Sequence, residues 1–287
     1  MREEMKSKVE ESKTTKKELV EKREEIILQT PSMILKWIKC IPESKKLNII
    51  CLDNRELRSL TADDYELSGD IMQLYIPSKP RKNAKKGRFK YVARQLARMI
   101  NKETSDETNI FRKYTSITFF ALGECGLCAV NIPEYLEENR TIRIVTIATP
   151  FFGTHMADKK FVKSKTGFFE RIKEYGKITQ IYHLPDEELS ERHKVLLKVD
   201  NAELKRHRWF NVIASTEQIS EFAHKVFGAD LSDGIVPKDS QNPESKNVDR
   251  TIYITASHED ALLKTIEYFN KAISNKALLK PVVHFKG

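Results

Sequence analysis

The stretch Ile117-Thr-Phe-Phe-Ala-Leu-Gly-Glu-Cys-Gly-Leu127 joins a short apolar run to a turn that holds two glycines and a cysteine. The run 117–122 is apolar and follows polar residues, which is typical of a strand buried on both faces. A short apolar segment with helix character follows, from Leu127 to about Leu136. The pattern therefore predicts a buried strand, a tight turn with the thiol of Cys125 at its apex, and a helix.

Similar apolar runs alternate with helical patterns along most of the chain. Runs with the character of buried strands lie at residues 47–52, 71–76, 143–148, 209–214 and 251–255. Apolar residues recur at helical spacing over residues 88–101 and 260–273. Strands that alternate with helices predict an α/β protein with a mainly parallel sheet that is covered on both faces. Ligand sites in such sheets lie beyond the carboxyl ends of the strands.

Length and composition describe a folded chain with a charged beginning. The chain has 287 residues, of which 40% are hydrophobic and 32% are charged, so collagen-like and disordered classes are excluded. Residues 1 to about 25 mix Lys with Glu, and the apolar residues of 26–38 suit the start of a packed helix. We therefore expect residues 1–40 to form a charged helical extension and residues 41–287 to form one domain.

The cysteines and the hydropathy favour a cytoplasmic protein. Four cysteines in a chain of this length, with no secretory leader at its start, indicate a reducing compartment and free thiols. No run approaches 18 consecutive apolar residues, so no membrane-spanning helix is expected.

Positive charge is concentrated in the segment Lys79–Lys90. This segment holds seven Lys and Arg residues and no acid, and subtracting them from the formal net charge of +9 leaves +2. The rest of the chain is nearly balanced, which makes nucleic acid an unlikely partner. Two interpretations of the segment remain, a solvated loop and a peripheral contact with anionic membrane lipids, to which each basic residue adds about 1 kcal/mol.

Four motifs together resemble the α/β-hydrolases of the lipase and esterase type. The turn Gly123-Glu-Cys-Gly126 is similar to their nucleophile elbow, usually G-x-S-x-G. The stretch Ile144-Val-Thr-Ile-Ala-Thr-Pro-Phe-Phe-Gly-Thr154 is similar to their TIGTPHxGS segment. Ser232-Asp-Gly-Ile-Val-Pro237 is similar to their DGxVP acid turn, and Ala256-Ser-His-Glu-Asp260 to their histidine loop. The resemblance covers about residues 45–275 and implies the α/β-hydrolase fold, a mainly parallel, doubly covered sheet with an inserted helical cap.

The resemblance also implies a reaction. Cys125 would be the nucleophile, His258 the general base and Asp233 the acid that orients the imidazole. Cys stands where the family usually has Ser, as in members like dienelactone hydrolase. The implied reaction is hydrolysis of an ester or a thioester with an apolar acyl part, through an acyl-enzyme, on a small-molecule or lipid-like substrate. No cofactor and no metal are implied, and the sequence leaves the oligomeric state open.

The chain departs from the family at the oxyanion hole and at the elbow. The backbone N–H of Gly126 would supply one oxyanion donor, but the His-Gly motif that supplies the second donor is missing. The corresponding place reads Cys51-Leu-Asp-Asn-Arg55, where the N–H of Asp53 or Asn54 would substitute. Leu127 also replaces the second elbow glycine. A catalytically degenerate α/β-hydrolase fold that acts as a binding or scaffold protein is therefore the alternative.

Several of these residues also have simpler interpretations. Asp233 precedes a glycine, and Asp-Gly is a common turn signal. A position at the N-terminus of a helix would by itself explain His258. A position on the protein surface would explain His155. Glu124, where lipases often have His, is either a solvated carboxylate or part of a pocket wall. The pair Cys125 and Cys128 has the spacing C-x-x-C but lacks the further ligands of a zinc site.

An insertion of about residues 155–207 precedes the strand 209–214. It interleaves aromatic and aliphatic residues with Lys, Arg and Glu. Such a segment fits the lid or cap of an acyl pocket. Helices packed permanently on the core fit the pattern equally well.

Overall fold

A computed structural model describes residues 26–29, 33–52, 60–76, 88–101, 110–137, 141–168, 171–181, 204 and 206–274. Their centre is an eight-stranded sheet in the order β1-β2-β4-β3-β5-β6-β7-β8. Strands β3 to β8 run parallel to one another, as the alternating pattern predicts. The strands are β1 (Ile26–Gln29), β2 (Ile34–Lys39), β3 (Lys46–Leu52), β4 (Asp70–Tyr75), β5 (Ser116–Leu122), β6 (Ile142–Ile147), β7 (Arg208–Ser215) and β8 (Arg250–Thr255).

The first two strands correct the interpretation of the N-terminal segment. Residues 26–38 do not begin a helix, because β1 and β2 form an antiparallel pair and β2 adds antiparallel to β4. The pairing of β2 with β4 shifts register between Trp37 and Lys39. This irregularity breaks the alternation by which a strand is identified from sequence. The sheet therefore begins at Ile26, within the stretch that we assigned to the extension.

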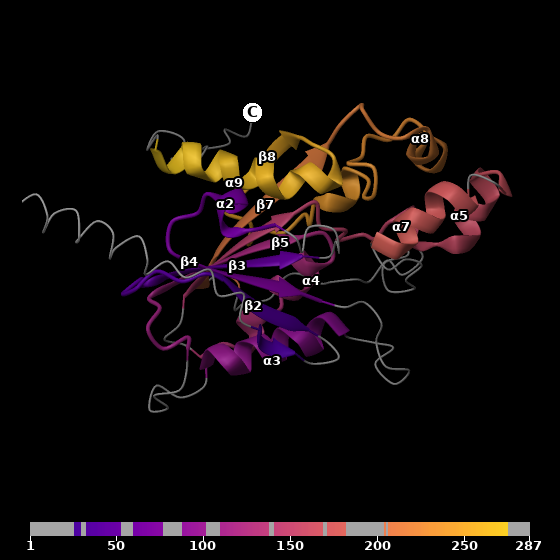
Figure 1. Ribbon diagram of the computed structural model, residues 1–287. Helices are drawn as coiled ribbons and strands as arrows, with labels where there is room; N and C mark the ends of the chain where they lie inside the picture. Colours follow the sequence, from indigo (N-terminus) through magenta and orange to yellow (C-terminus); the bar gives the residue numbers. More distant parts are fainter. Residues whose placement is uncertain are drawn as a thin grey trace, which may run out of the picture.

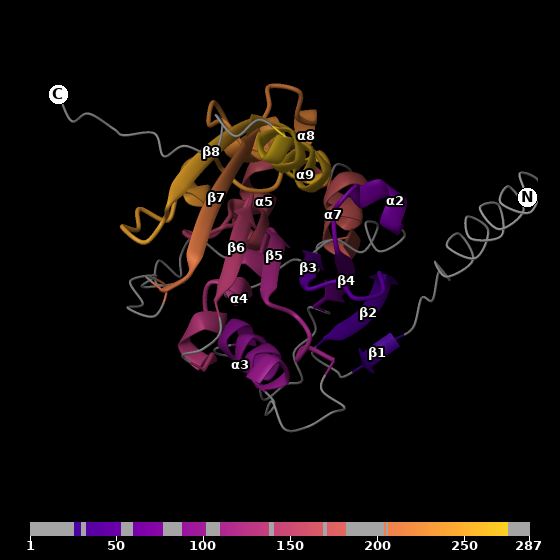
Figure 2. The ribbon, with the colours of Figure 1, turned by 90° about the vertical axis from the view of Figure 1, so that its left-hand side faces the viewer.

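Helices cover both faces of the sheet (Figures 1 and 2). On one face, α3 (Arg88–Asn101) and α4 (Cys125–Ala129) pack on inward-facing residues such as Phe119 and Ala121. On the other, α2 (Ala62–Tyr65) and α9 (His258–Ser274) pack on residues such as Phe120 and Leu122. The remaining helices are η2 (Ile132–Tyr135), η3 (His155–Ala157), α5 (Lys159–Lys165), η4 (Arg171–Tyr175), α7 (Gly176–Ile181), α8 (Glu221–Phe227) and η6 (Asp239–Gln241).

The insertion between β6 and β7 is helical in its described part. In Figure 1, α5 and α7 lie together at one side of the molecule, with α8 nearby. Tyr175 joins this part to the rest, since its hydroxyl donates to the carbonyl of Met156 at 2.9 Å and its ring stacks on Phe222 of α8. Residues 182–203 lie outside the described residues. Whether the segment acts as a lid or as a fixed cover stays a prediction.

These layers form the α/β-hydrolase fold, which the sequence motifs imply. The carboxyl ends of β5, β6, β7 and β8 lead into the elbow, the Thr149–Thr154 segment, the acid turn and the histidine loop. Of the basic segment, residues 79–87 lie outside the described part and Arg88–Lys90 begin α3. No helix among the described residues is both long and apolar enough to cross a membrane.

Candidate functional site

The acid turn is built around the carboxylate of Asp233. Its Oδ1 accepts the backbone N–H groups of Ile235 at 2.9 Å and Val236 at 2.7 Å, while Gly234 turns the chain with φ +99°. The carboxylate is buried, with 2% of the residue exposed. Asp233 therefore forms the turn that the Asp-Gly pair indicates, and it does so through Oδ1. Its second oxygen, Oδ2, has another partner.

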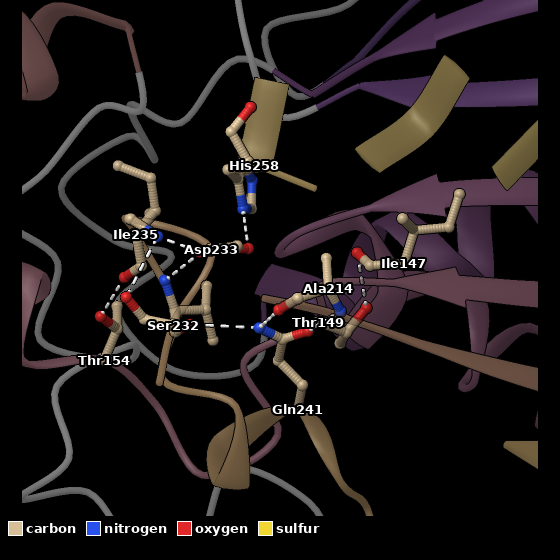
Figure 3. A network of polar contacts seen from close by, with 12 residues as sticks. Ile147, Thr149, Thr154, Ala214, Ser232, Asp233, Ile235, Gln241 and His258 are labelled. Carbon is tan, nitrogen blue, oxygen red and sulfur yellow. Dashed lines mark hydrogen bonds and ion pairs between the residues drawn. The ribbon is translucent and has the colours of Figure 1, made fainter. Parts of the chain in front are cut away.

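That partner is His258. Its Nδ1 lies 2.6 Å from Asp233 Oδ2, and its backbone N–H donates to the Asp233 carbonyl at 2.9 Å (Figure 3). His258 is the first residue of α9, and Ser257 before it accepts the N–H of Asp260 at 3.2 Å. Both members of the pair are buried, so the contact excludes water.

This contact determines what the imidazole can do. A carboxylate only accepts hydrogen bonds, so Nδ1 of His258 carries the proton and Nε2 of the neutral ring is the basic nitrogen. Asp233 in turn stabilises the imidazolium that forms when Nε2 takes a proton. The pair has the arrangement of a general base with its orienting acid, two of the three residues that the resemblance names.

The turn after β5 differs from the expected elbow. Gly123 adopts the left-handed conformation, with φ +55°, whereas Cys125 is the first residue of α4. Glu124 between them is already helical, at φ −61° and ψ −23°. The expectation that Cys125 takes the strained backbone at the apex is therefore wrong. Cys125 is fully buried, and its role as nucleophile stays a prediction.

The predicted oxyanion donors are described only in part. The N–H of Gly126 donates to the Gly123 carbonyl at 3.0 Å, within the turn itself. A Cβ at Gly126 would lie 1.9 Å from Thr149 Oγ1, so glycine is required there for the close approach of α4 to the segment after β6. Asp53 and Asn54 lie outside the described residues.

Sequence reasoning missed a buried glutamine that holds the acid turn. Gln241 is fully buried, its Oε1 accepts the Ala214 N–H at 2.7 Å, and its Nε2 donates to the carbonyls of Ala214 at 2.9 Å and Val236 at 3.1 Å. It thereby ties the end of β7 to the turn of Asp233 (Figure 3). Thr154 binds the same turn through the Ile235 carbonyl. No spacing signal marks Gln241 in the sequence.

The other candidates have structural surroundings. Glu124 is 5% exposed, so the solvated interpretation is wrong. His155 is half-buried and stacks on Phe161 with ring centroids 4.0 Å apart, and desolvation lowers its pKa. None of the four cysteines forms a disulfide, and Cys125 and Cys128 are buried on α4. Within the described ranges, no group of three His, Cys, Asp or Glu side chains is placed to hold a metal ion.

Comparison with known proteins finds structures but no related sequences. No family model matches the chain, and no curated protein matches it. An esterase from Pyrococcus furiosus is 12% identical, with a TM-score of 0.46, over 90% of this chain and 92% of its own. A type II thioesterase of the yersiniabactin pathway is 11% identical, with a TM-score of 0.47, over 86% and 99%. A lipase-esterase related protein from Clostridium acetobutylicum is 14% identical, with a TM-score of 0.44, over 85% and 99%.

Proposed function

We propose that the chain hydrolyses an ester or a thioester, with His258 as the general base and Asp233 as the acid that orients it. The observation that carries the proposal is the buried contact of 2.6 Å between His258 Nδ1 and Asp233 Oδ2 at the carboxyl edge of the sheet. A buried carboxylate is costly unless it is paired and hydrogen-bonded, and Asp233 directs its second oxygen at a single imidazole nitrogen. Acid–base chemistry at His258 accounts for it.

In this proposal, His258 first takes up a proton and then returns it. Its Nε2 takes a proton from the attacking group as the bond to the acyl carbon forms, and Asp233 stabilises the resulting imidazolium. The imidazolium then gives the proton to the alcohol or thiol that leaves. No metal or cofactor is needed for these steps.

Two attacking groups fit this scheme. The first is the thiol of Cys125, which the sequence resemblance names and which would form an acyl-enzyme that water then hydrolyses. The second is a water molecule that attacks the substrate directly. Only the first produces a covalent adduct on the protein, so the two forms can be separated by mass.

A hollow beside the acid turn has a mixed wall, in which apolar residues alternate with the charged residues Asp230, Lys238, Asp239 and Glu244. Its volume is about 780 Å³, within the range of small-molecule sites, and Leu231 and Pro237 from either side of Asp233 line it. Phe152 and Leu231 are the large apolar residues of its wall and are 43% and 48% exposed. Binding of an acyl chain there would bury both side chains.

The second candidate function is that of a non-catalytic binding or scaffold protein. The left-handed φ of +55° at Gly123 favours it, because the strained position of the turn then holds a residue without a side chain. In this case the contact between Asp233 and His258 only fixes the loops at the edge of the sheet.

A panel of acyl substrates separates the two functions. Wild-type protein and His258→Ala are assayed with p-nitrophenyl esters and acyl thioesters of increasing chain length, and His224→Ala of the exposed face of α8 is the matched control. We expect turnover in the wild type and in His224→Ala, and a loss of about 10²–10⁴-fold in His258→Ala. Equal rates in all three proteins, or no turnover over the whole panel, would leave the binding protein as the function.

A further inference from the structure

The backbone of the turn after β5 places its strained residue at Gly123. The N–H of Gly123 donates to the Ile147 carbonyl at 2.8 Å, so the residue still belongs to the β5–β6 ladder. The next residue, Glu124, has helical angles, and α4 begins at Cys125. The whole change of direction from strand to helix therefore occurs at Gly123, at φ +55°. In a nucleophile elbow this position belongs to the nucleophile.

Small residues stand two positions before and two positions after Gly123, whereas only the earlier of these positions is small around Cys125. Two positions before Gly123 is Ala121, and two and three positions after it are Cys125 and Gly126. Counted from Cys125 instead, the second position after it is Leu127, which is too large for a close contact of strand and helix. In the structure, Gly126 makes that contact. A Cβ added to Gly126 would lie only 1.9 Å from Thr149 Oγ1. The spacing of small residues in a nucleophile elbow is therefore matched when Gly123 is taken as its centre.

Cys125 and the residues around His258 pack on opposite faces of the sheet. The cysteine is fully buried and belongs to the core under α3 and α4, together with Ala121 and Leu127. Ala256 and Ala261, on either side of His258, belong to the core under α9 on the opposite face of the sheet. The helix that Cys125 begins therefore packs on one face of the sheet, and the helix that His258 begins packs on the other.

We propose that Gly123, and not Cys125, holds the position that faces His258, and that the attacking group at this site is a water molecule. The inference rests on the proposed function and names its nucleophile. The water oxygen forms the bond to the acyl carbon while His258 Nε2 takes one water proton. The bond from the acyl carbon to the alcohol oxygen or thiol sulfur then breaks, and His258 returns the proton to that leaving group. The products are the free acid and the alcohol or thiol, with no acyl-enzyme between them.

Thiol mapping tests which position faces the base and needs no turnover. Wild-type protein and the double variant Gly123→Cys/Cys125→Ala are each treated with iodoacetamide, with and without the added change His258→Ala, and alkylation of each cysteine is followed by peptide mass. The exposed Cys40 is the internal reference. We expect the thiol introduced at position 123 to react about fivefold faster than Cys40 or more, since a neighbouring imidazole raises its thiolate fraction, and to lose this advantage in His258→Ala. Wild-type Cys125 should react more slowly than Cys40, whichever residue stands at position 258.

Two alkylation results would overturn the inference, and so would a covalent acyl adduct. One is a wild-type Cys125 that reacts faster than Cys40 and slows in His258→Ala, and this comparison decides the matter even where the double variant does not fold. The other is an introduced thiol at position 123 that reacts no faster than Cys40 in a folded double variant. Failure of the proposed function is read separately, from equal turnover of wild type and His258→Ala on the acyl panel. A mass shift of wild-type protein by one acyl group during turnover would keep the hydrolase and reject the water.

Discussion

The contact between Gly126 and Thr149 gives a prediction whose size follows from the structure. The change Gly126→Ala puts a Cβ 1.9 Å from Thr149 Oγ1 and 2.7 Å from its Cγ2, whereas ordinary contacts begin near 3.4 Å. Thr149 is fully buried, so the side chain has no open space into which to move. Overpacking of this kind costs about 1–3 kcal/mol, against which the higher helix propensity of alanine returns about 1 kcal/mol.

Chemical denaturation with a double-mutant cycle measures this contact. The approach of 1.9 Å is far below contact distance, which places the overpacking cost at its upper end, so after the alanine gain we expect Gly126→Ala to lower the free energy of unfolding by about 2 kcal/mol. Thr149→Ala removes the two closest atoms, so the double variant should recover part of the loss, with a coupling energy of about 1 kcal/mol. Gly176→Ala is the matched control, because a Cβ there meets nothing nearer than 3.9 Å and should leave the stability unchanged or raised. A Gly126→Ala variant as stable as the wild type, or a cycle without coupling, would refute the packing of α4 described here.

Three further predictions concern the buried polar and thiol groups. In Asp233→Asn, the amide N–H₂ faces His258 and favours the wrong tautomer, so we expect kcat on the best substrate of the panel to fall roughly 10⁴-fold with the fold retained by circular dichroism. The fully buried Asp70 binds Lys113 Nζ at 2.8 Å and the Ile41 N–H at 2.7 Å, so Asp70→Ala should cost about 3 kcal/mol in urea unfolding. Burial raises the pKa of the Cys51 thiol, so it should stay unalkylated by iodoacetamide at pH 8 until denaturant unfolds the protein.

Much of the sheet could be predicted because its strands are buried on both faces. The run 117–122 corresponds to β5 and the helical pattern of 88–101 to α3. Continuous apolar runs identify such strands whatever their register. The segment of β2 has no continuous apolar run. Its burial does not alternate regularly either, because its pairing with β4 shifts register. Its pairing with β1 and β4 determines that it is a strand.

The candidate site could be predicted in part for a similar reason. Asp233 lies in a short motif whose turn geometry and acid role depend on adjacent residues, so the motif predicts both. Gln241 acts through Ala214 and Val236, which the fold alone brings to it. The left-handed residue of this turn could not be predicted because glycine and cysteine are both small, and the pattern of small residues leaves two possible centres. The backbone angle at Gly123 separates them.

The account depends most on the proton that Asp233 holds on His258. Nuclear magnetic resonance of protein labelled with ¹⁵N at histidine reports which ring nitrogen of His258 is protonated, with His258→Ala to assign the signals. The account predicts protonated Nδ1 and unprotonated Nε2 in the neutral ring of the wild type, and the reverse in Asp233→Asn. A wild-type ring protonated at Nε2, or a tautomer that Asp233→Asn leaves unchanged, would contradict it.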